Sequence, residues 1–271
     1  MTGFPDPHTI QIQTLRGGHL YQTPDGSFWG ATKILKILGL STEPLISWAA
    51  RVERDAVLEA CAEIYAQGCD GGPAEFVALV EARIGETKQH QKIKQKAGDI
   101  GSTIHQEIHR RINVMLGEPA GPEQKLTDQA EWAVMAWQDW WKQAGLTPYR
   151  AEQPVWEAEL GYAGTIDLLA KDSQGRLGVV DLKSSRGIYD DHHLQVTAYM
   201  HAARNFEPVD WGLIVRVPKN VEDPVFEVRE LGKLYDRTLT YDELLADWRA
   251  TVLLWRSLIA KDLVIPKKGT P

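Results

Sequence analysis

The periodicity of hydrophobic positions divides the chain into a mainly helical first part and a second part rich in strands. Apolar residues recur at helical spacing over residues 31–38, 41–68, 73–85, 86–116 and 126–145. Before these helices, residues 18–30 (GHLYQTPDGSFWG) predict a hairpin. Pro24, Asp25 and Gly26 form a strong turn signal between two short strand-like segments.

After Tyr149 the pattern changes to short apolar or alternating runs that are typical of strands. We expect strands at residues 149–159, 161–171, 176–185, 211–218 and 225–231, and helices at 190–205 and 241–260. This order predicts an α/β fold with a central mixed β-sheet flanked by helices. It also predicts two parts, an N-terminal hairpin and helical region over residues 1–85 and a core over residues 86–271.

Composition adds few restrictions to this fold. Hydrophobic residues make up 43% and charged residues 25% of the 271 residues, as in an average globular protein. No apolar run is long enough to span a membrane, and the first residues lack the basic and apolar segments of a signal peptide. Cys61 and Cys69 are too few for a disulfide framework. We therefore expect a reducing, cytoplasmic setting and no membrane partner.

The segment VVDLKSS (residues 179–185) carries the first sign of chemistry. It has the apolar character of a buried strand, yet Asp181 and Lys183 lie two residues apart within it. Side chains alternate faces along a strand, so both charges project from the same face of the sheet. Because burying an uncompensated charge is costly, they must form a pair, bind a metal or serve a reaction.

The register of the preceding strand brings a second acid to this face. If residues 172–176 form a five-residue loop with Gly175 at positive φ, Asp167 lies directly opposite Asp181, with side chains about 5 Å apart. Two facing carboxylates repel unless a cation lies between them, and their oxygens suit Mg²⁺ or Mn²⁺. The alternative is a salt bridge between Lys183 and one aspartate, which would leave the other carboxylate unpaired.

Four sequence motifs now appear in a fixed order over residues 98–200. They are a helix histidine (His105), GTID (164–167), DLK (181–183) and a glutamine–tyrosine pair (Gln195 and Tyr199). Together they resemble the PD-(D/E)xK nuclease superfamily, and most closely its RecB-like branch, which includes phage and mitochondrial single-strand DNA exonucleases. The resemblance implies a restriction-endonuclease-like core, hydrolysis of phosphodiester bonds, and a role in DNA recombination and repair in a bacterial or phage-infected cell.

The resemblance also assigns metal ligands and catalytic residues. His105, Asp167, Asp181 and the backbone carbonyl of Leu182 would hold one or two Mg²⁺ or Mn²⁺ ions. Lys183 would orient the attacking water, help to deprotonate it, or stabilise the transition state. Relatives with an iron–sulfur cluster need four cysteines, so the two present here imply that there is no such cluster.

Two catalytic candidates have alternative interpretations. His105 shares a helix face with Gly98 and Gly101, which indicates close approach by the sheet or by DNA, although an isolated helix histidine more often bonds within the core. His109, one turn later, is a weaker candidate. Glu152 begins the strand before GTID, where it could reach the metal or orient Lys183, and the sequence leaves both roles open.

The expected nucleic-acid contacts lie on several elements. They are Gln195, Tyr199, Arg186, Ser184 and Lys94, with further positive charge from Lys88, Lys92, Lys96, Arg110 and Arg111. The net charge of −7 argues against a nucleic-acid partner, but local patches matter more when the active site itself is acidic. Trp137, Trp140 and Trp141 could stack on bases, and their helical spacing favours core packing instead.

The sequence therefore predicts a metal-dependent deoxyribonuclease, most simply an exonuclease that acts on single-stranded or frayed DNA ends. In this interpretation residues 1–85 form an arch or wall that admits a threaded strand. A structure-specific or restriction-like endonuclease with the same chemistry is one alternative. The other is a catalytically idle nucleic-acid-binding module on the same fold, which the mutual repulsion of the two aspartates disfavours.

Overall fold

The computed structural model describes residues 3–15, 17–39, 42–68, 71–219 and 225–260. It contains two compact units, one made of Met1–Leu38 together with Thr103–Pro271 and the other of Gly39–Ser102. This division differs from the boundary expected between residues 85 and 86. The reason is that the N-terminal hairpin pairs with a strand of the core and so joins the first unit.

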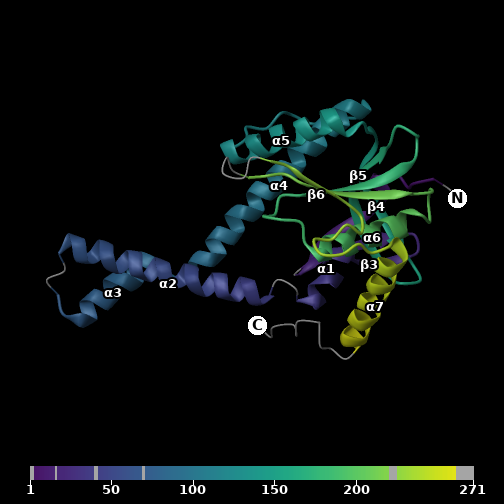
Figure 1. Cartoon of the computed structure of the whole chain (residues 1–271). Coiled ribbons are helices and arrows are strands. Elements are labelled where there is room, and N and C mark those ends of the chain that lie inside the picture. Colours follow the sequence, from purple (N-terminus) through teal and green to yellow (C-terminus); the bar gives the residue numbers. More distant parts are fainter. Residues whose placement is uncertain (1–2, 16, 40–41, 69–70, 220–224, 261–271) are drawn as a thin grey trace. The chain divides into compact units, whose positions relative to one another are not determined.

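The first unit is built on an eight-stranded mixed sheet (Figure 1). Its strands are β1 (Gln11–Leu15), β2 (Gly18–Thr23), β3 (Gly26–Gly30), β4 (Thr147–Glu157), β5 (Tyr162–Lys171), β6 (Leu177–Lys183), β7 (Trp211–Arg216) and β8 (Glu227–Glu230). Their order is β1-β2-β3-β5-β6-β7-β8, and β4 pairs with β5 outside this path. The pairs β3–β5 and β6–β7 are parallel and the others antiparallel, which confirms the mixed sheet.

The predicted register between β5 and β6 is confirmed. Lys171 pairs with Leu177, and the loop between them contains Gly175 at φ 76°. The ladder ends at Leu168 and Val180, one step before the two aspartates. Strand β1 was not predicted from the sequence, and its five residues are all exposed.

The sheet divides along one edge of β5, where β3 and β6 pair with different parts of the strand. Strand β4 pairs along the length of β5 on one edge. On the other edge β3 pairs with the first residues of β5, Tyr162 and Ala163, and β6 pairs only from Leu168 onward. In the described part of the chain, residues 164–167 therefore have no ladder partner on that edge. These four residues are the GTID motif.

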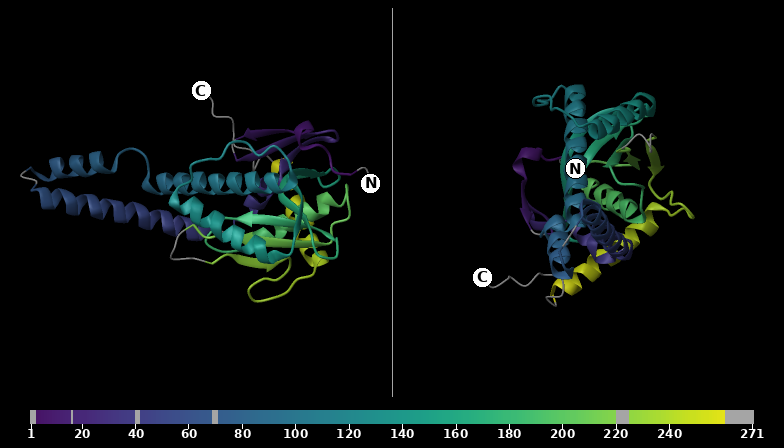
Figure 2. Two further views of the ribbon diagram at one scale, coloured as in Figure 1. Left: turned by 90° about the horizontal axis from the view of Figure 1, so that it is seen from above. Right: turned by 90° about the vertical axis from the view of Figure 1, so that its left-hand side faces the viewer.

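Helices cover both faces of this sheet (Figures 1 and 2). The short elements η1 (Pro7–Thr9), α1 (Ala31–Leu35) and η2 (Lys36–Leu38) belong to the N-terminal segment, and α5 (Asp128–Ala144), α6 (Asp190–Ala203) and α7 (Tyr241–Ala260) follow. Helix α5 lies on one face, and α6 and α7 lie on the other. Trp137 and Trp140 of α5 are buried, which confirms their core role, while Trp141 is half-buried and stacks on Trp137 at 5.8 Å.

Helix α4 (Gln89–Leu116) begins three residues later than predicted, and only its residues from Thr103 onward belong to the first unit. Within that portion Ile104, Ile108 and Ile112 recur at four-residue spacing and are fully buried. This buried stripe fixes the rotation of the helix about its axis. The fixed rotation in turn decides where His105, beside the first isoleucine, can project.

The second unit consists of α2 (Thr42–Gln67), α3 (Pro73–Ile84) and the first part of α4. Ala60, Ile64 and Val80 form its small core. An ion pair joins Glu53 to His90, with 2.8 Å between Oε1 and Nδ1. Cys61 has a free thiol, whereas Cys69 and the first predicted residue of α2, Ser41, lie outside the described residues. Among the described helices, none is long and apolar enough to cross a membrane.

Candidate active site

Three acids lie in one row across neighbouring strands, at the position where the sheet divides. The β4–β5 ladder keeps the same register on both sides of Glu152 and so sets it across from Asp167. Continuing the β5–β6 register places Asp181 across from Asp167 on the other side. Sequence reasoning identified the Asp167–Asp181 half of this row, but it could not place Glu152, because the β4–β5 connection gave no register.

Asp167 is held between β6 and α4. Its Oδ2 accepts a hydrogen bond from the backbone N–H of Leu182 at 2.7 Å, and its Oδ1 lies 3.8 Å from Nδ1 of His105. The Asp167 side chain is 19% exposed and that of His105 is 31% exposed, so both reach solvent. The expectation that pairing Lys183 with Asp181 would leave Asp167 without a partner is therefore wrong.

Lys183 and Asp181 form an ion pair, with 2.5 Å between Nζ and Oδ2. The Asp181 side chain is 2% exposed and the Lys183 side chain 16% exposed. The structure thus contains the salt bridge that the sequence offered as the alternative. Burial nevertheless raises the pKa of Asp181 to about 6, because the opposing effect of Lys183 is incomplete and Asp167 adds repulsion.

Glu152 is the most strained residue of the row. Among the described residues it is the one non-glycine with positive φ, at 46°, a conformation that costs on the order of 1–3 kcal/mol. Burial, and then the charge of Asp167, raise the pKa of Glu152 to about 8. At neutral pH its carboxyl group therefore mostly retains a proton. Asp167 is the charged neighbour that contributes to this shift, and a role of Glu152 at the metal or beside Lys183 stays a prediction.

A sequence model of the PD-(D/E)XK nuclease superfamily matches residues 71–254, which contain all three acids and Lys183. The chain belongs to the PD-(D/E)XK nuclease superfamily. Members of this superfamily are generally hydrolytic nucleases that use divalent metals such as Mg²⁺ or Mn²⁺.

Other comparisons add little to this assignment. A solved structure described as the crystal structure of SSO0001 is 14% identical in sequence to this chain. The matched region covers 51% of this chain and 68% of the SSO0001 chain, with a TM-score of 0.26. No curated protein matches the chain. Membership in the PD-(D/E)XK superfamily therefore rests on the sequence model, and the residue roles rest on the site itself.

The acids fit the divalent cation that PD-(D/E)XK nucleases use. In the described part of the chain no three His, Cys, Asp or Glu side chains converge as a ready metal cage. The row nevertheless contains three carboxyl groups and one lysine, which already pairs with Asp181. The pKa values of Glu152 and Asp181 are raised. Carboxylate and carbonyl oxygens are the hard ligands that suit Mg²⁺ or Mn²⁺, and one imidazole nitrogen can complete their coordination. The candidate ligands are therefore Asp167, Asp181, the carbonyl of Leu182, and His105.

Tyr199 of α6, hydrogen-bonded to Gln195, packs against the GTID segment of β5. Gln195 Nε2 donates to Tyr199 Oη at 2.7 Å, and both side chains are buried. A Cβ added to Gly164 would clash with the ring of Tyr199, so the ring packs directly against this glycine. The predicted pairing of the two side chains is confirmed, but their burial disfavours the direct nucleic-acid contact that we expected.

Several residues near the site carried no motif in the sequence. Tyr21 of the hairpin lies 3.1 Å, Oη to Oγ1, from Thr165, and Asp167 and Glu152 contribute to its raised pKa after burial. At the start of α6, burial and then the charge of Lys183 lower the pKa of His192 to about 3. Only the fold brings these residues to the acids, so no local signal could have identified them.

The remaining predicted contacts have mixed surroundings. Ser184 is half-buried and Arg186 exposed in the loop after Lys183. Lys94 is exposed and belongs to the second unit, so its contact with nucleic acid stays a prediction. Burial lowers the pKa of His109, and Asp167 opposes that shift, so this weaker candidate is near the row. A Cβ on Gly98 would meet no described atom within 4 Å, so tight packing against protein does not explain that glycine.

Proposed function

We propose that this chain is a divalent-metal-dependent deoxyribonuclease of the RecB-like type that removes nucleotides from single-stranded or frayed DNA ends. The observation that carries the proposal is the row of Glu152, Asp167 and Asp181 at the division of the sheet, with Lys183 as its single cation and His105 beside it. Such a surplus of acid has no structural use, because it destabilises the sheet that contains it.

The roles of the residues follow from their surroundings. Asp167, Asp181, the Leu182 carbonyl and His105 would hold one or two Mg²⁺ or Mn²⁺ ions. A bound divalent ion lowers the pKa of a coordinated water and offsets negative charge on the phosphate oxygens. Asp167 is oriented for this role in advance by the Leu182 N–H, and Tyr199 and Gln195 fix the backbone of GTID beneath it.

Lys183 has two functions in this proposal. Its ammonium group keeps the buried Asp181 ionised against the effect of burial. The same group, 16% exposed, can hold a water molecule or a phosphate oxygen on the open face of the site. Glu152, protonated at neutral pH, can donate a hydrogen bond where an ionised acid could not.

The experiment that tests the proposal compares linear and circular single-stranded DNA. The wild-type chain is incubated with end-labelled linear strands and with closed circles, in Mn²⁺, in Mg²⁺ and in excess chelator. We expect the linear strand to be degraded from an end, the circle to survive, and the chelator to abolish cleavage. Hydrolysis that continues in excess chelator would overturn the metal-dependent mechanism.

Two alternatives correspond to other results of the same experiment. Cleavage of the circle would identify a structure-specific or restriction-like endonuclease with the same chemistry. Binding without cleavage of any strand would identify an idle nucleic-acid-binding module, which the Lys183–Asp181 ion pair favours because it ties up both groups. The role of the N-terminal helical residues as an arch or wall stays a prediction from the sequence.

A further inference from the structure

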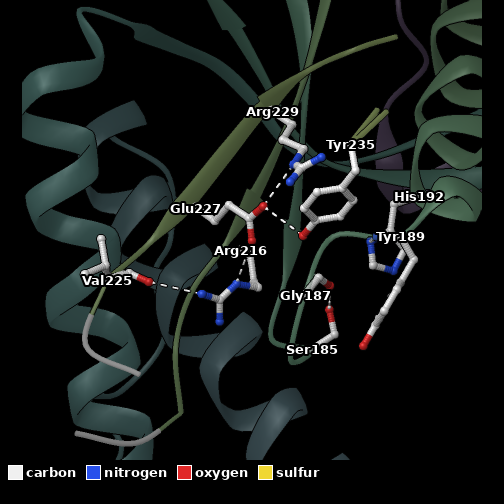
Figure 3. Close-up of polar contacts among 9 residues, drawn as sticks. All are labelled: Ser185, Gly187, Tyr189, His192, Arg216, Val225, Glu227, Arg229 and Tyr235. Carbon is white, nitrogen blue, oxygen red and sulfur yellow. Dashed lines mark hydrogen bonds and ion pairs between the residues drawn. The ribbon is translucent and has the colours of Figure 1, made fainter. Parts of the chain in front are cut away.

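Two exposed tyrosines lie beside the loop that follows Lys183 and have no part in the chemistry proposed above. Tyr189 is 52% exposed and Tyr235 is 69% exposed, although large aromatic rings usually bury more of their surface. A Cβ placed on Gly187 would lie 3.9 Å from ring carbons of Tyr189 and 3.9 Å from Oη of Tyr235. The two rings therefore flank the same glycine (Figure 3).

The ring of Tyr235 is held in place without being buried. Its Oη donates to Glu227 Oε1 at 3.3 Å, and the guanidinium of Arg229 lies 3.3 Å from the ring centroid. Glu227 in turn accepts from Arg229 Nε at 2.9 Å (Figure 3). The arginine covers one face of the ring and leaves the ring mostly exposed, so its orientation is fixed before any ligand binds.

Tyr189 is fixed in a similar way at the start of α6. Its backbone N–H donates to Nδ1 of the buried His192 at 3.2 Å, and the two rings meet edge to face with 5.4 Å between centroids. Within the loop, Ser185 Oγ donates to the carbonyl of Gly187 at 2.7 Å. The neighbouring acid Asp190 lies 3.7 Å from Arg237, so its charge is partly offset.

These tyrosines are connected to the candidate active site through one charged residue of β7. Arg216 pairs in register with Lys183, and its Nε lies 3.3 Å from Glu227 Oε2, the same carboxylate that holds Tyr235. Arg216 is 6% exposed, so the end of this link at the sheet is buried. The carboxylate that holds Tyr235 is therefore joined through Arg216 to the strand that pairs with Lys183.

We propose that Tyr189 and Tyr235 form a stacking site for unpaired bases of the strand whose backbone enters the candidate active site. A tyrosine ring held in place can stack on any base, because every base has a π-face, and little ordering entropy is lost on binding. Bases in a duplex are already paired and stacked, so the site selects single-stranded nucleic acid. This inference rests on the proposed nuclease function and specifies its substrate.

The test measures binding, separately from cleavage, in a full-length Asp167→Asn background that prevents degradation. The probes are a fluorescent single strand of thymidines, the same strand with one abasic position, and a blunt duplex. We expect Tyr189→Ala and Tyr235→Ala each to weaken single-strand binding about 10-fold, as for the loss of one stacked base, and to leave duplex binding unchanged. Tyr189→Phe and Tyr235→Phe, the matched controls, keep the ring and should stay within about 3-fold of the parent.

The abasic probe makes the test specific for stacking. The abasic position is moved along the strand, and at one or two of its positions binding to the parent protein should weaken. The alanine variant of the tyrosine that stacks there should show no such further loss. Unchanged affinity of both alanine variants would overturn the inference, as would an equal loss on duplex or in the phenylalanine controls. If wild type fails to cleave while the alanine variants still lose single-strand binding, the nuclease proposal fails and the stacking site stands.

Discussion

The first unit compensates the acid Glu107 of α4 and the acids of the row in β4, β5 and β6 in opposite ways. On α4, Glu107 is 2% exposed and accepts hydrogen bonds from Arg110 and Arg111, three in all at 2.7–2.8 Å. Those bonds, with Arg110 first, hold its pKa below the usual value. In the row of β4, β5 and β6, by contrast, the pKa values of Glu152 and Asp181 are raised, because burial outweighs the single lysine.

The difference separates an acid that the protein itself compensates from acids that it leaves partly uncompensated. Glu107 is fully compensated by cations of the protein itself, so it stabilises the first unit in its ionised form. The row lacks the positive charge that would complete it, and an external cation would supply that charge. The number of buried carboxylates is therefore less informative than the sign of their pKa shifts.

The largest expected effect is on cleavage by Asp167→Asn. This change removes the central carboxylate of the row, and we expect cleavage to fall by about 1,000-fold or more. Without metal the free energy of unfolding should change by less than about 1 kcal/mol. The relief of repulsion between Asp167 and its neighbouring acids offsets the weaker hydrogen bond from the Leu182 N–H. Cleavage rates and melting curves of the same preparation measure both. A variant that loses several kcal/mol without metal would show that Asp167 is structural.

Lys183→Ala should affect both activity and stability. Cleavage should fall by about 100-fold or more, and the free energy of unfolding by about 2–3 kcal/mol at pH 8, since Asp181 is then buried without its partner. The raised pKa of Asp181, about 6 in the intact protein, means that this carboxyl can take a proton in acid. The stability loss should therefore shrink towards pH 5, as urea melts at the two pH values would show. Wild-type cleavage by this variant would exclude a catalytic role for Lys183.

Glu107→Gln tests the compensated acid. We expect a loss of about 2–4 kcal/mol in stability at pH 7, because two guanidinium groups lose their anionic partner. The folded-state pKa of Glu107 lies below its unfolded value, so its stabilisation is complete above the unfolded pKa and is lost as pH falls through the folded one. The gap between variant and wild type should thus narrow below about pH 4. Cleavage per folded molecule should be unchanged, and a large loss would place Glu107 in the site.

The smallest effect is expected for Glu152→Gln. The folded pKa of Glu152, about 8, lies above its unfolded value, so its contribution to stability is full below the unfolded pKa and is lost as pH rises through 8. At about pH 4, below the unfolded pKa, the neutral glutamine should match the protonated acid within about 1 kcal/mol. At pH 9 the metal-free variant should be more stable than wild type. Equal stability of the two proteins at both pH values would mean that Glu152 ionises normally.

The elements of the row were predictable where a loop fixed their register. Residues 172–176 determined the pairing of Lys171 with Leu177, and from it the facing of Asp167 and Asp181. The expected motif pair Gln195 and Tyr199 also followed from helical spacing. These successes concern contacts within one hairpin or one helix, where local geometry decides the outcome.

The sequence could not predict contacts between segments that are far apart in the chain. The pairing of Trp29 with Tyr162, which brings the hairpin and Tyr21 to the site, depends on the complete sheet. The link from Arg216 through Glu227 to Tyr235 likewise needs two strands and a loop to meet. Alternation along a single strand reveals which side chains share a face, but not which strand lies beside it.

The most direct test of the central claim is whether a divalent cation compensates the row and leaves Glu107 unaffected. Melting temperatures of wild type, Asp167→Asn and Glu107→Gln are measured in excess chelator and in saturating Mn²⁺. We predict that Mn²⁺ raises the melting temperature of wild type and of Glu107→Gln by about 5 °C or more, and that of Asp167→Asn by much less. An equal rise in all three proteins, or none in wild type, would contradict the account.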